Sequence, residues 1–457
     1  MDFAALPDGP VTLVGVTVPT CLASERGGRS PTAGGGGAPA PILDCAPVAR
    51  RGGRGLPGVP PGGMDDLVRT DLHIRDGHLS DRPGTRVDMR GAMVLPCFAD
   101  MHTHLDKGHI WPRAANPDGT FTGALTTVRA DHANWTASDV AARMDFSLRC
   151  AFAHGTRAVR THLDSMGGQA AVSFPVWAEA RDRWAGRVDL QAVSLMPVEA
   201  VERGGDFARV ADIVADHGGV LGCVSYPVDD LRDRLRTVFD MAAARGLAVD
   251  FHTDETMDPS SETLRAIAET VIETGFDAPV VVGHCCSLST QDEARAMDTL
   301  DLVAKAGLSV ASLPMCNLYL QDRHAGRTPR NRGVTLVHEM SARGIPVAFA
   351  SDNTRDPFYA YGDLDMLEVL REATRIAHLD HSRGDWIRAV TTTPAAVCGF
   401  PARGLAPGDP ADLVILRARS WTEGLARPQS DRIVLRAGRA IDRRLPDHAE
   451  LDEVVSP

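Results

Sequence analysis

Residues 93–106 read MVLPCFADMHTHLD, an apolar run of strand length that ends in two closely spaced histidines. Side chains two positions apart on an extended segment point to the same face, so the imidazoles of His102 and His104 project together. More apolar runs of strand length follow, separated by segments such as 231–244 and 260–274 whose apolar residues have helical spacing. The predicted strands are residues 93–98, 158–163, 189–195, 220–224, 248–252, 280–284, 309–313 and 346–351.

Eight alternations of strand and helix over roughly 300 residues are typical of one large barrel. The sequence therefore predicts an α/β protein with a (β/α)8 TIM-type barrel, whose catalytic groups lie at the carboxyl ends of the strands. Strand-like runs with alternating or β-branched residues also occur near both chain ends, at 11–18, 71–79, 412–416 and 432–436. We expect these runs to form a small β-sandwich domain built from both ends of the chain.

The predicted domain organisation has three segments. Residues 1–92 supply the N-terminal part of the small β-domain, and residues 400–457 supply its C-terminal part. Residues 93–399 form the metal-dependent barrel. Within the first segment, the stretch from about 27 to 63 is rich in glycine and proline, and this composition predicts a disordered loop.

Composition narrows the class of protein. The net charge of −12 argues against nucleic acid or an anionic membrane surface as the main partner. No run of 18 apolar residues occurs, and the first residues lack the basic and apolar regions of a signal peptide. Nine cysteines without a repeating spacing do not favour a disulfide scaffold. We therefore expect a cytoplasmic enzyme that acts on a small molecule.

Metal-binding residue types recur at the predicted strand ends. His102 and His104 follow the first strand, His252 ends the fifth, His284 ends the sixth and Asp352 follows the eighth. The carboxyl ends of all barrel strands lie on one side, so these five candidate ligands or bases should converge. Neutral imidazole suits zinc or ferrous iron.

These residues lie in motifs that resemble the amidohydrolase superfamily, most of all its cytosine deaminase branch. The resemblance covers about residues 70–440. Its central motifs are MHTHLD at 101–106, HTDE at 252–255, GH at 283–284 and SD at 351–352. Supporting stretches are VRTHLD at 159–164, LPMCNLYLQDR at 313–323 and GLAPGDPADLVIL at 404–416.

The resemblance implies one divalent metal ion, zinc or iron. Binuclear members of the superfamily use a carboxylated lysine at the end of strand four, but no lysine lies between Lys107 and Lys305. By resemblance His284 is hydrogen-bonded to a metal-bound water. The implied metal ligands are His102, His104, His252 and Asp352.

The same resemblance implies hydrolytic deamination. A divalent ion lowers the pKa of bound water from about 16 towards 7. Asp352 and His284 can accept the proton of that water, and Glu255 can move a proton to a ring nitrogen. We therefore predict a metal-dependent deaminase that releases ammonia from cytosine or a related pyrimidine. The alternative is hydrolysis of a cyclic amide or of a triazine C–N bond. A non-enzymatic barrel is not favoured, because all the ligands and Glu255 are present.

Two departures from the branch concern substrate recognition. Cytosine deaminases carry a glutamine in the stretch where residues 195–197 of this chain read LMP, and a second carboxylate where this chain has Asn353. Methylated cytosine, pterin-like rings and creatinine-like cyclic guanidines are therefore candidate substrates as well.

Some residues near these motifs have two interpretations each. His162 either holds the substrate or satisfies a buried hydrogen bond, and Gln321 either reaches the substrate or packs. Phe358 either forms a wall for an aromatic ring or belongs to the core. Asp106 and Lys107 are expected to form a salt bridge that stabilises the loop. The resemblance also implies a homo-oligomer.

Overall fold

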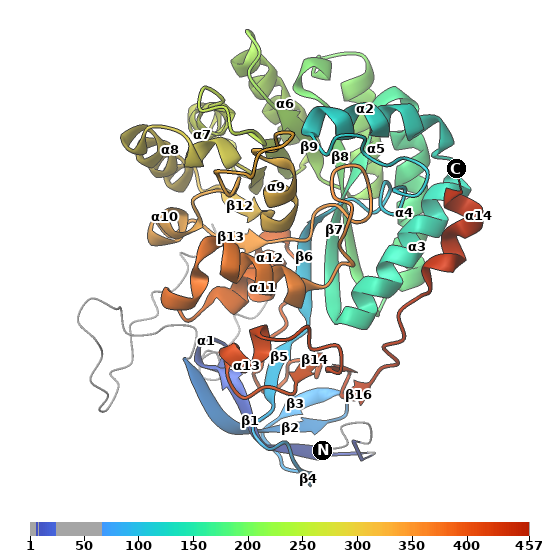
Figure 1. Cartoon of the computed structure of the whole chain (residues 1–457), viewed down its shortest axis with the longest axis vertical. Helices are drawn as coiled ribbons and strands as arrows, with labels where there is room; N and C mark the ends of the chain where they lie inside the picture. The colour runs from blue at the N-terminus through green and yellow to red at the C-terminus, as the bar shows by residue number, and fades with distance from the viewer. Residues whose placement is uncertain (1–5, 8, 24–65, 457) are drawn as a thin grey trace.

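The computed structural model describes residues 6–7, 9–23 and 66–456 (Figure 1). The predicted glycine- and proline-rich loop at 27–63 lies outside the described residues. None of the eight cysteines in the described part of the chain forms a disulfide. Among the described helices, none has the length and apolar character that crossing a membrane requires.

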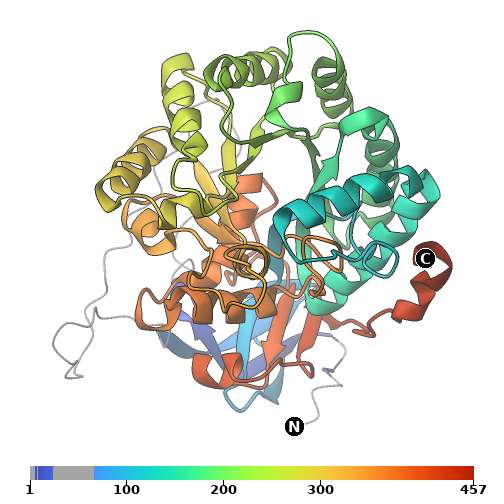
Figure 2. The same cartoon turned by 45° about the horizontal axis from the view of Figure 1, so that its top comes forward.

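The centre of the molecule is a barrel of parallel strands, which confirms the predicted TIM-type fold (Figure 2). Its strands pair in two runs, β6 to β8 and β9 to β13. Bridges between Val193 and Val220 and between Thr103 and Asp352 join the two runs and close the barrel. The barrel strands are β6 (Phe98–Thr103), β7 (Thr156–Asp164), β8 (Asp189–Leu195), β9 (Leu221–Ser225), β10 (Val249–Thr253), β11 (Val280–His284), β12 (Ser309–Ser312) and β13 (Val347–Phe349).

Helices surround the strands because each buries one apolar face against them. In α5, for example, Phe207, Val210, Ala211 and Val214 are buried at helical spacing. The long helices around the barrel are α3 (Ala137–His154), α4 (Ala170–Trp184), α5 (Asp206–His217), α6 (Leu231–Arg245), α7 (Thr263–Thr274), α8 (Glu293–Lys305) and α11 (Met366–Ala377). Shorter helices are α1 (Thr20–Ala23), α9 (Pro314–Leu320), α10 (Val337–Ala342), α12 (Thr392–Cys398), α13 (Trp421–Leu425) and α14 (Asp452–Val455).

The first barrel strand differs from the prediction. Residues 93–98 were expected to form it, but β5 (Met93–Pro96) pairs with β14 and β1 in a separate sheet. The barrel begins one residue later with β6, which itself contains His102. Both strands are fully buried, so their hydrophobicity does not reveal the break between them.

The separate sheet is built from both chain ends, as Figure 1 shows below the barrel. Its order is β16-β15-β14-β5-β1-β2-β3, with β4 paired to β1. Because these strands form one connected sheet, the predicted sandwich of two packed sheets stays a prediction, and so does the division into domains. The remaining bounds are β1 (Val11–Pro19), β2 (Leu67–Arg75), β3 (His78–Ser80), β4 (Thr85–Asp88), β14 (Leu413–Leu416), β15 (Ile433–Arg436) and β16 (Arg439–Ala440).

The segment between β6 and α3 is unusually long and contains α2 (Phe121–Asp131). Thr120 caps this helix by accepting a hydrogen bond from the backbone N–H of Gly123 at 3.0 Å. The βα-loops of a barrel surround its catalytic end. The helix α2 contributes one wall of the cavity at that end.

Candidate active site

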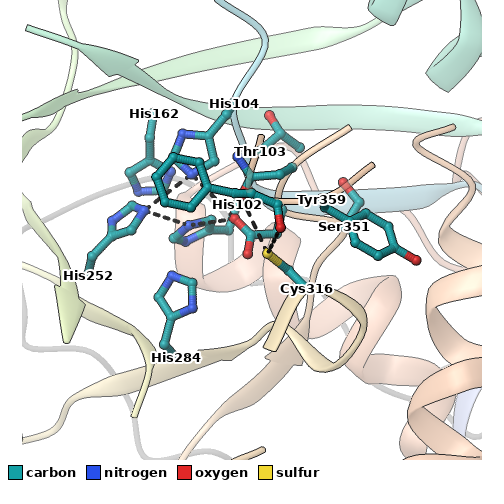
Figure 3. A network of polar contacts seen from close by, with 12 residues as sticks. His102, Thr103, His104, His162, His252, His284, Cys316, Ser351 and Tyr359 are labelled. Atoms are coloured by element: carbon teal, nitrogen blue, oxygen red, sulfur yellow. Dashed lines mark hydrogen bonds and ion pairs between the residues drawn. The ribbon is translucent and has the colours of Figure 1, made fainter. Parts of the chain in front are cut away.

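Three imidazoles point toward one another at the carboxyl end of the barrel (Figure 3). The Nε2 atom of His252 lies 3.1 Å from Nε2 of His102 and 3.2 Å from Nε2 of His104. Oδ1 of Asp352 lies 3.6 Å from Nε2 of His102 and 3.3 Å from Nε2 of His104. The four side chains come from β6, its following loop, β10 and the segment after β13, so closure of the barrel brings them together.

The backbone positions Asp352 directly. Its N–H donates to the carbonyl oxygen of His102 at 2.9 Å. This hydrogen bond joins the segment after the last barrel strand, β13, to the first barrel strand, β6. Gly283 allows β11 to approach the same imidazole, because a Cβ at this position would lie 3.0 Å from Cε1 of His102. The glycine before His284 therefore makes room for the imidazole of His102.

The donor atoms fit a single divalent ion. With bonds of about 2.1 Å to zinc, the ligand atoms of a tetrahedron stand about 3.4 Å apart. Neither carboxylate oxygen of Asp352 accepts a hydrogen bond from a nitrogen or oxygen donor among the described residues, although both are buried. A buried carboxylate without such donors is costly unless a cation compensates it.

Burial also sets the protonation of these groups. It lowers the pKa values of His102, His104 and His252 well below the usual value, and neighbouring charged groups, imidazoles among them, add to the effect. The rings are therefore neutral, which is the form that binds metal. With protein charges alone, burial raises the pKa of Asp352 to about 7, and nearby Asp356 also raises it.

Glu255 and His284 lie beside this cluster. Oε1 of Glu255 is 3.5 Å from Nδ1 of His284, and Nδ1 of His284 is 2.9 Å from Nδ2 of Asn317. Burial and the charge of Asp352 raise the pKa of Glu255 well above its usual value. Burial and His162 lower the pKa of His284 to about 3. Burial thus favours the uncharged form of each group, a carboxylic acid beside a neutral imidazole.

Two of these strand-end residues have unusual backbone conformations. His284 and Asp352 both have a φ of 66°, in the left-handed region that side chains other than glycine seldom adopt. Such conformations cost of order 1–3 kcal/mol each and cluster at functional sites. Here they turn two polar side chains toward the same point.

A cavity of about 760 Å³ lies over the cluster. His104, His252, Glu255, His284 and Asp352 line its floor. Its apolar walls include residues 195–197 and the face of α2 with Phe121, Leu125 and Val128. The site is therefore a deep, mostly apolar pocket with a few converging polar groups.

Three of the four residues expected to bind substrate lie on the cavity wall, and His162 does not. Gln321, Asn353 and Phe358 line the cavity. Nε2 of Gln321 donates to the backbone oxygen of Glu255 at 3.1 Å, and Nδ2 of Asn353 donates to Asp356 at 2.8 Å. Phe358 packs edge-on against Phe121 of α2, with 5.5 Å between ring centroids.

His162 takes a different place. Its ring is fully buried and does not line the cavity, and it contacts the His102 ring at a tilt of 36° with 3.9 Å between centroids. Its Nε2 lies 3.4 Å from Oδ1 of Asp250, whose other oxygen accepts a hydrogen bond from Arg160 at 2.7 Å. Of the two interpretations of His162, this position favours the buried polar contact that supports a candidate ligand.

The sequence did not reveal the wall formed by α2 or the partner of Lys107. The length of the segment between β6 and α3 is the signal for the first, because long βα-loops surround barrel active sites. The expected salt bridge between Asp106 and Lys107 is not formed. Lys107 instead pairs with Asp164 at the end of β7, at 3.2 Å. Asp106 accepts a hydrogen bond from the backbone N–H of Asp164 at 2.8 Å.

Known proteins resemble this chain over most of its length. A pterin deaminase from Rhizobium rhizogenes is 55% identical over 401 residues, which are 86% of this chain and 92% of the relative. The solved structure of 5-methylcytosine deaminase from Klebsiella pneumoniae with 5-fluorocytosine has a TM-score of 0.72 and 26% identity, covering 83% of this chain and 95% of that chain. N-isopropylammelide isopropylaminohydrolase from Burkholderia multivorans has a TM-score of 0.66 and 25% identity, with the same two coverages of 83% and 95%.

The model of the amidohydrolase family matches residues 207–441, from α5 through the end of the barrel to the strands of the small sheet. This match and the structural neighbours confirm the resemblance inferred from the motifs, including that to the cytosine deaminase branch. The chain belongs to the amidohydrolase family.

Proposed function

We propose that this metal-dependent hydrolase removes the amino group of a pterin, a fused two-ring heterocycle with a 2-amino-4-oxo pyrimidine half. The observation that carries deamination is the convergence of His102, His104, His252 and Asp352 beside Glu255 on the floor of one cavity. The overall reaction replaces the ring C–NH2 with C=O, consumes one water and releases one ammonia.

The residues of the floor have distinct roles in this proposal. His102, His104, His252 and Asp352 would hold one divalent ion, zinc or iron. Such an ion would supply hydroxide near neutral pH by lowering the pKa of water. Asp352 and His284 would accept a proton from the attacking water. Both line the cavity, and Nε2 of the neutral His284 imidazole has no hydrogen-bond partner among the described residues.

Glu255 acts as the general acid. Burial raises the pKa of its carboxyl group, which favours the protonated form that can donate to the ring nitrogen next to the amino-bearing carbon. Protonation of that nitrogen makes the carbon electrophilic. The amine then leaves as ammonia once it has received a proton.

The size and walls of the cavity support a two-ring substrate. A volume of about 760 Å³ exceeds what a single pyrimidine fills. Phe358 and Phe121 supply aromatic walls, and the apolar residues 195–197 leave no amide at the position where cytosine is recognised in the branch. The pterin deaminase that is 55% identical supports the same ring. Pterin, which the sequence offered as an alternative substrate, is therefore favoured over cytosine.

A methylated cytosine is the second candidate. The likeness to the Klebsiella 5-methylcytosine deaminase, at 26% identity and a TM-score of 0.72, favours it. Its ring is smaller than the cavity, and the identity is less than half of that to the pterin deaminase. Hydrolysis of a triazine C–N bond is supported at 25% identity by the Burkholderia relative.

Ammonia release from a panel of rings tests the proposal. Metal-loaded protein is assayed with pterin, 5-methylcytosine, cytosine, creatinine and N-isopropylammelide. We expect kcat/KM for pterin to exceed every other value by at least about 100-fold, because a substrate that leaves the few polar groups of the pocket unpaired is rejected. Ammonia from 5-methylcytosine at a higher kcat/KM would contradict the pterin assignment. Light scattering of the same sample tests the homo-oligomer that the family resemblance implies.

A further inference from the structure

A buried ion pair lies on the cavity wall outside the candidate metal cluster. Lys107, in the loop after β6, has a side chain that is 5% exposed, and its Nζ lies 3.2 Å from Oδ1 of Asp164 at the end of β7. Both residues line the cavity. The ammonium also stands 5.0 Å from the centroid of the Phe358 ring, which lines the same cavity.

The pair has hydrogen-bonding capacity to spare. An ammonium group has three donors, and Asp164 is the one hydrogen-bond partner of Nζ in the part of the chain that the structure describes. Oδ2 of Asp164 likewise accepts no hydrogen bond within residues 66–456. A donor and an acceptor therefore remain side by side on a wall that a substrate ring would contact.

The ammonium of Lys107 stays charged in this position. Burial alone would lower its pKa, but the carboxylates of Asp164, Asp356 and Asp106 outweigh burial and raise it. In turn, the Lys107 charge lowers the pKa values of Glu255 and Asp352, which line the same cavity. If Lys107 acted only as a counterion, its removal would change kcat/KM equally for every substrate. If it recognises the substrate, the change depends on whether the substrate carries a hydrogen-bond acceptor at that position.

We infer that Lys107 and Asp164 bind the lactam edge of the substrate ring, with Nζ donating to its carbonyl oxygen and the carboxylate accepting from the adjacent ring N–H. This inference rests on the proposed function. A donor beside an acceptor is what the side-chain amide of glutamine provides, and residues 195–197 offer no such side chain. With the lactam nitrogen held by Asp164, the other ring nitrogen beside the amino-bearing carbon is left for Glu255.

The test compares two substrates that differ at the lactam edge. Pterin and 2-aminopteridine carry the same amino group, but 2-aminopteridine lacks both the 4-oxo group and the adjacent ring N–H. Lys107→Met keeps the length of the side chain and removes its donors. We expect kcat/KM for pterin to fall about 10- to 100-fold and kcat/KM for 2-aminopteridine to change by less than about threefold. The preference for pterin should collapse.

Two further variants keep the test decisive. Lys305→Met makes the same chemical change at the exposed end of α8 and should leave both kcat/KM values unchanged. Asp164→Asn keeps the size of the side chain and should also reduce the preference for pterin, even if Lys107→Met does not fold. Bound metal is measured for every variant, and a recognition role leaves it at the wild-type level.

The possible results separate this inference from the proposed function. Equal losses for both rings in Lys107→Met and Asp164→Asn would show a counterion or structural role and overturn the inference. Unchanged kinetics in both variants would overturn it too. If wild-type holoenzyme releases no ammonia from pterin, the proposed function fails. If the wild-type enzyme deaminates pterin and the variants keep the same preference for pterin over 2-aminopteridine, only the assignment of Lys107 and Asp164 is wrong.

Discussion

The guanidinium of Arg113 donates to the backbone carbonyl of Val454 at 2.9 Å and so ties the C-terminal segment to the active-site end of the barrel. Arg113 also bonds Asp131, the last residue of α2, at 2.9 Å and Asp139 of α3 at 2.6 Å. Figure 1 shows α14 lying along α3. One side chain therefore joins the chain end, the cavity wall and a barrel helix.

Removal of residues 447–457 should destabilise the protein and weaken substrate binding. Leu451 and Val455 are buried against Phe146 and Cys150 of α3, and losing them costs about 3 kcal/mol. The α2 wall also loses its indirect anchor through Arg113, so we expect KM to rise several-fold with a smaller change in kcat. Denaturant unfolding and steady-state kinetics measure both effects. Removal of residues 456–457 alone is the control, and equal effects of the two deletions would contradict this role.

Loss of a candidate ligand should remove the metal and the activity together. His104→Asn and Asp352→Asn each take one donor from the cluster, and we expect bound metal well below one equivalent and kcat at least about 1,000-fold lower. Elemental analysis and ammonia release measure the two quantities. His381→Asn changes an imidazole that is 88% exposed and should retain both. Full metal content in Asp352→Asn would show that Asp352 is not a ligand.

Glu255→Gln should separate catalysis from metal binding. The amide keeps the size of the side chain but has no acidic proton to deliver, so we expect turnover to fall about 100- to 10,000-fold. The side chain is not among the candidate ligands, and metal content should stay at the wild-type level. Single-turnover ammonia release with metal analysis checks this. Near-normal turnover would eliminate Glu255 as the proton donor.

Asp139 should contribute stability that is lost in acid. Burial raises its pKa, but hydrogen bonds from Arg113 and Arg143 outweigh burial and hold the pKa below its usual value. A carboxyl group whose folded pKa is depressed stabilises the fold fully above its unfolded pKa of about 3.9 and loses this contribution as the pH falls through the folded pKa. The contribution of Asp139 is therefore present at pH 7 and declines below about pH 4.

Asp139→Asn tests that contribution. The substitution leaves the fully buried Arg143 without its charge partner, so unfolding should become easier by about 3–5 kcal/mol at pH 7. The difference from wild type should shrink as the pH falls from 4 to 2. Asp206→Asn, in an exposed pair with Arg209, should change stability by less than about 1 kcal/mol. Denaturation curves across this pH range decide whether the difference narrows.

Much of the fold could be predicted because strands and helices leave local patterns of apolar residues in the sequence. The buried runs from residue 156 onward appear as β7 to β13 with ends shifted by no more than about two residues, within the error of such predictions. The exception is the run from 93 to 103. Its first half pairs with β14 and its second half with β7, and partners remote in sequence made that choice.

The candidate site was predictable in part for the same reason. The positions of His252, His284 and Asp352 at the ends of predicted strands were enough to predict that they lie at one end of the barrel. They did not place His162, because inward residues at two levels of a barrel look alike in the sequence. Its position one level below the cavity floor depends on the tilt and stagger of β7 against β6 and β8.

The sequence by itself determined the barrel, the convergence of its histidines and Asp352, and the family, because strand periodicity and residue type are local properties of the chain. Only the tertiary structure decided that Lys107 pairs with Asp164 rather than with Asp106, that α2 forms a cavity wall and that the C-terminal segment is fastened by Arg113. Those contacts join segments far apart in the chain, and their partners are selected by packing geometry and by the need to compensate buried charge, neither of which leaves a periodic signal.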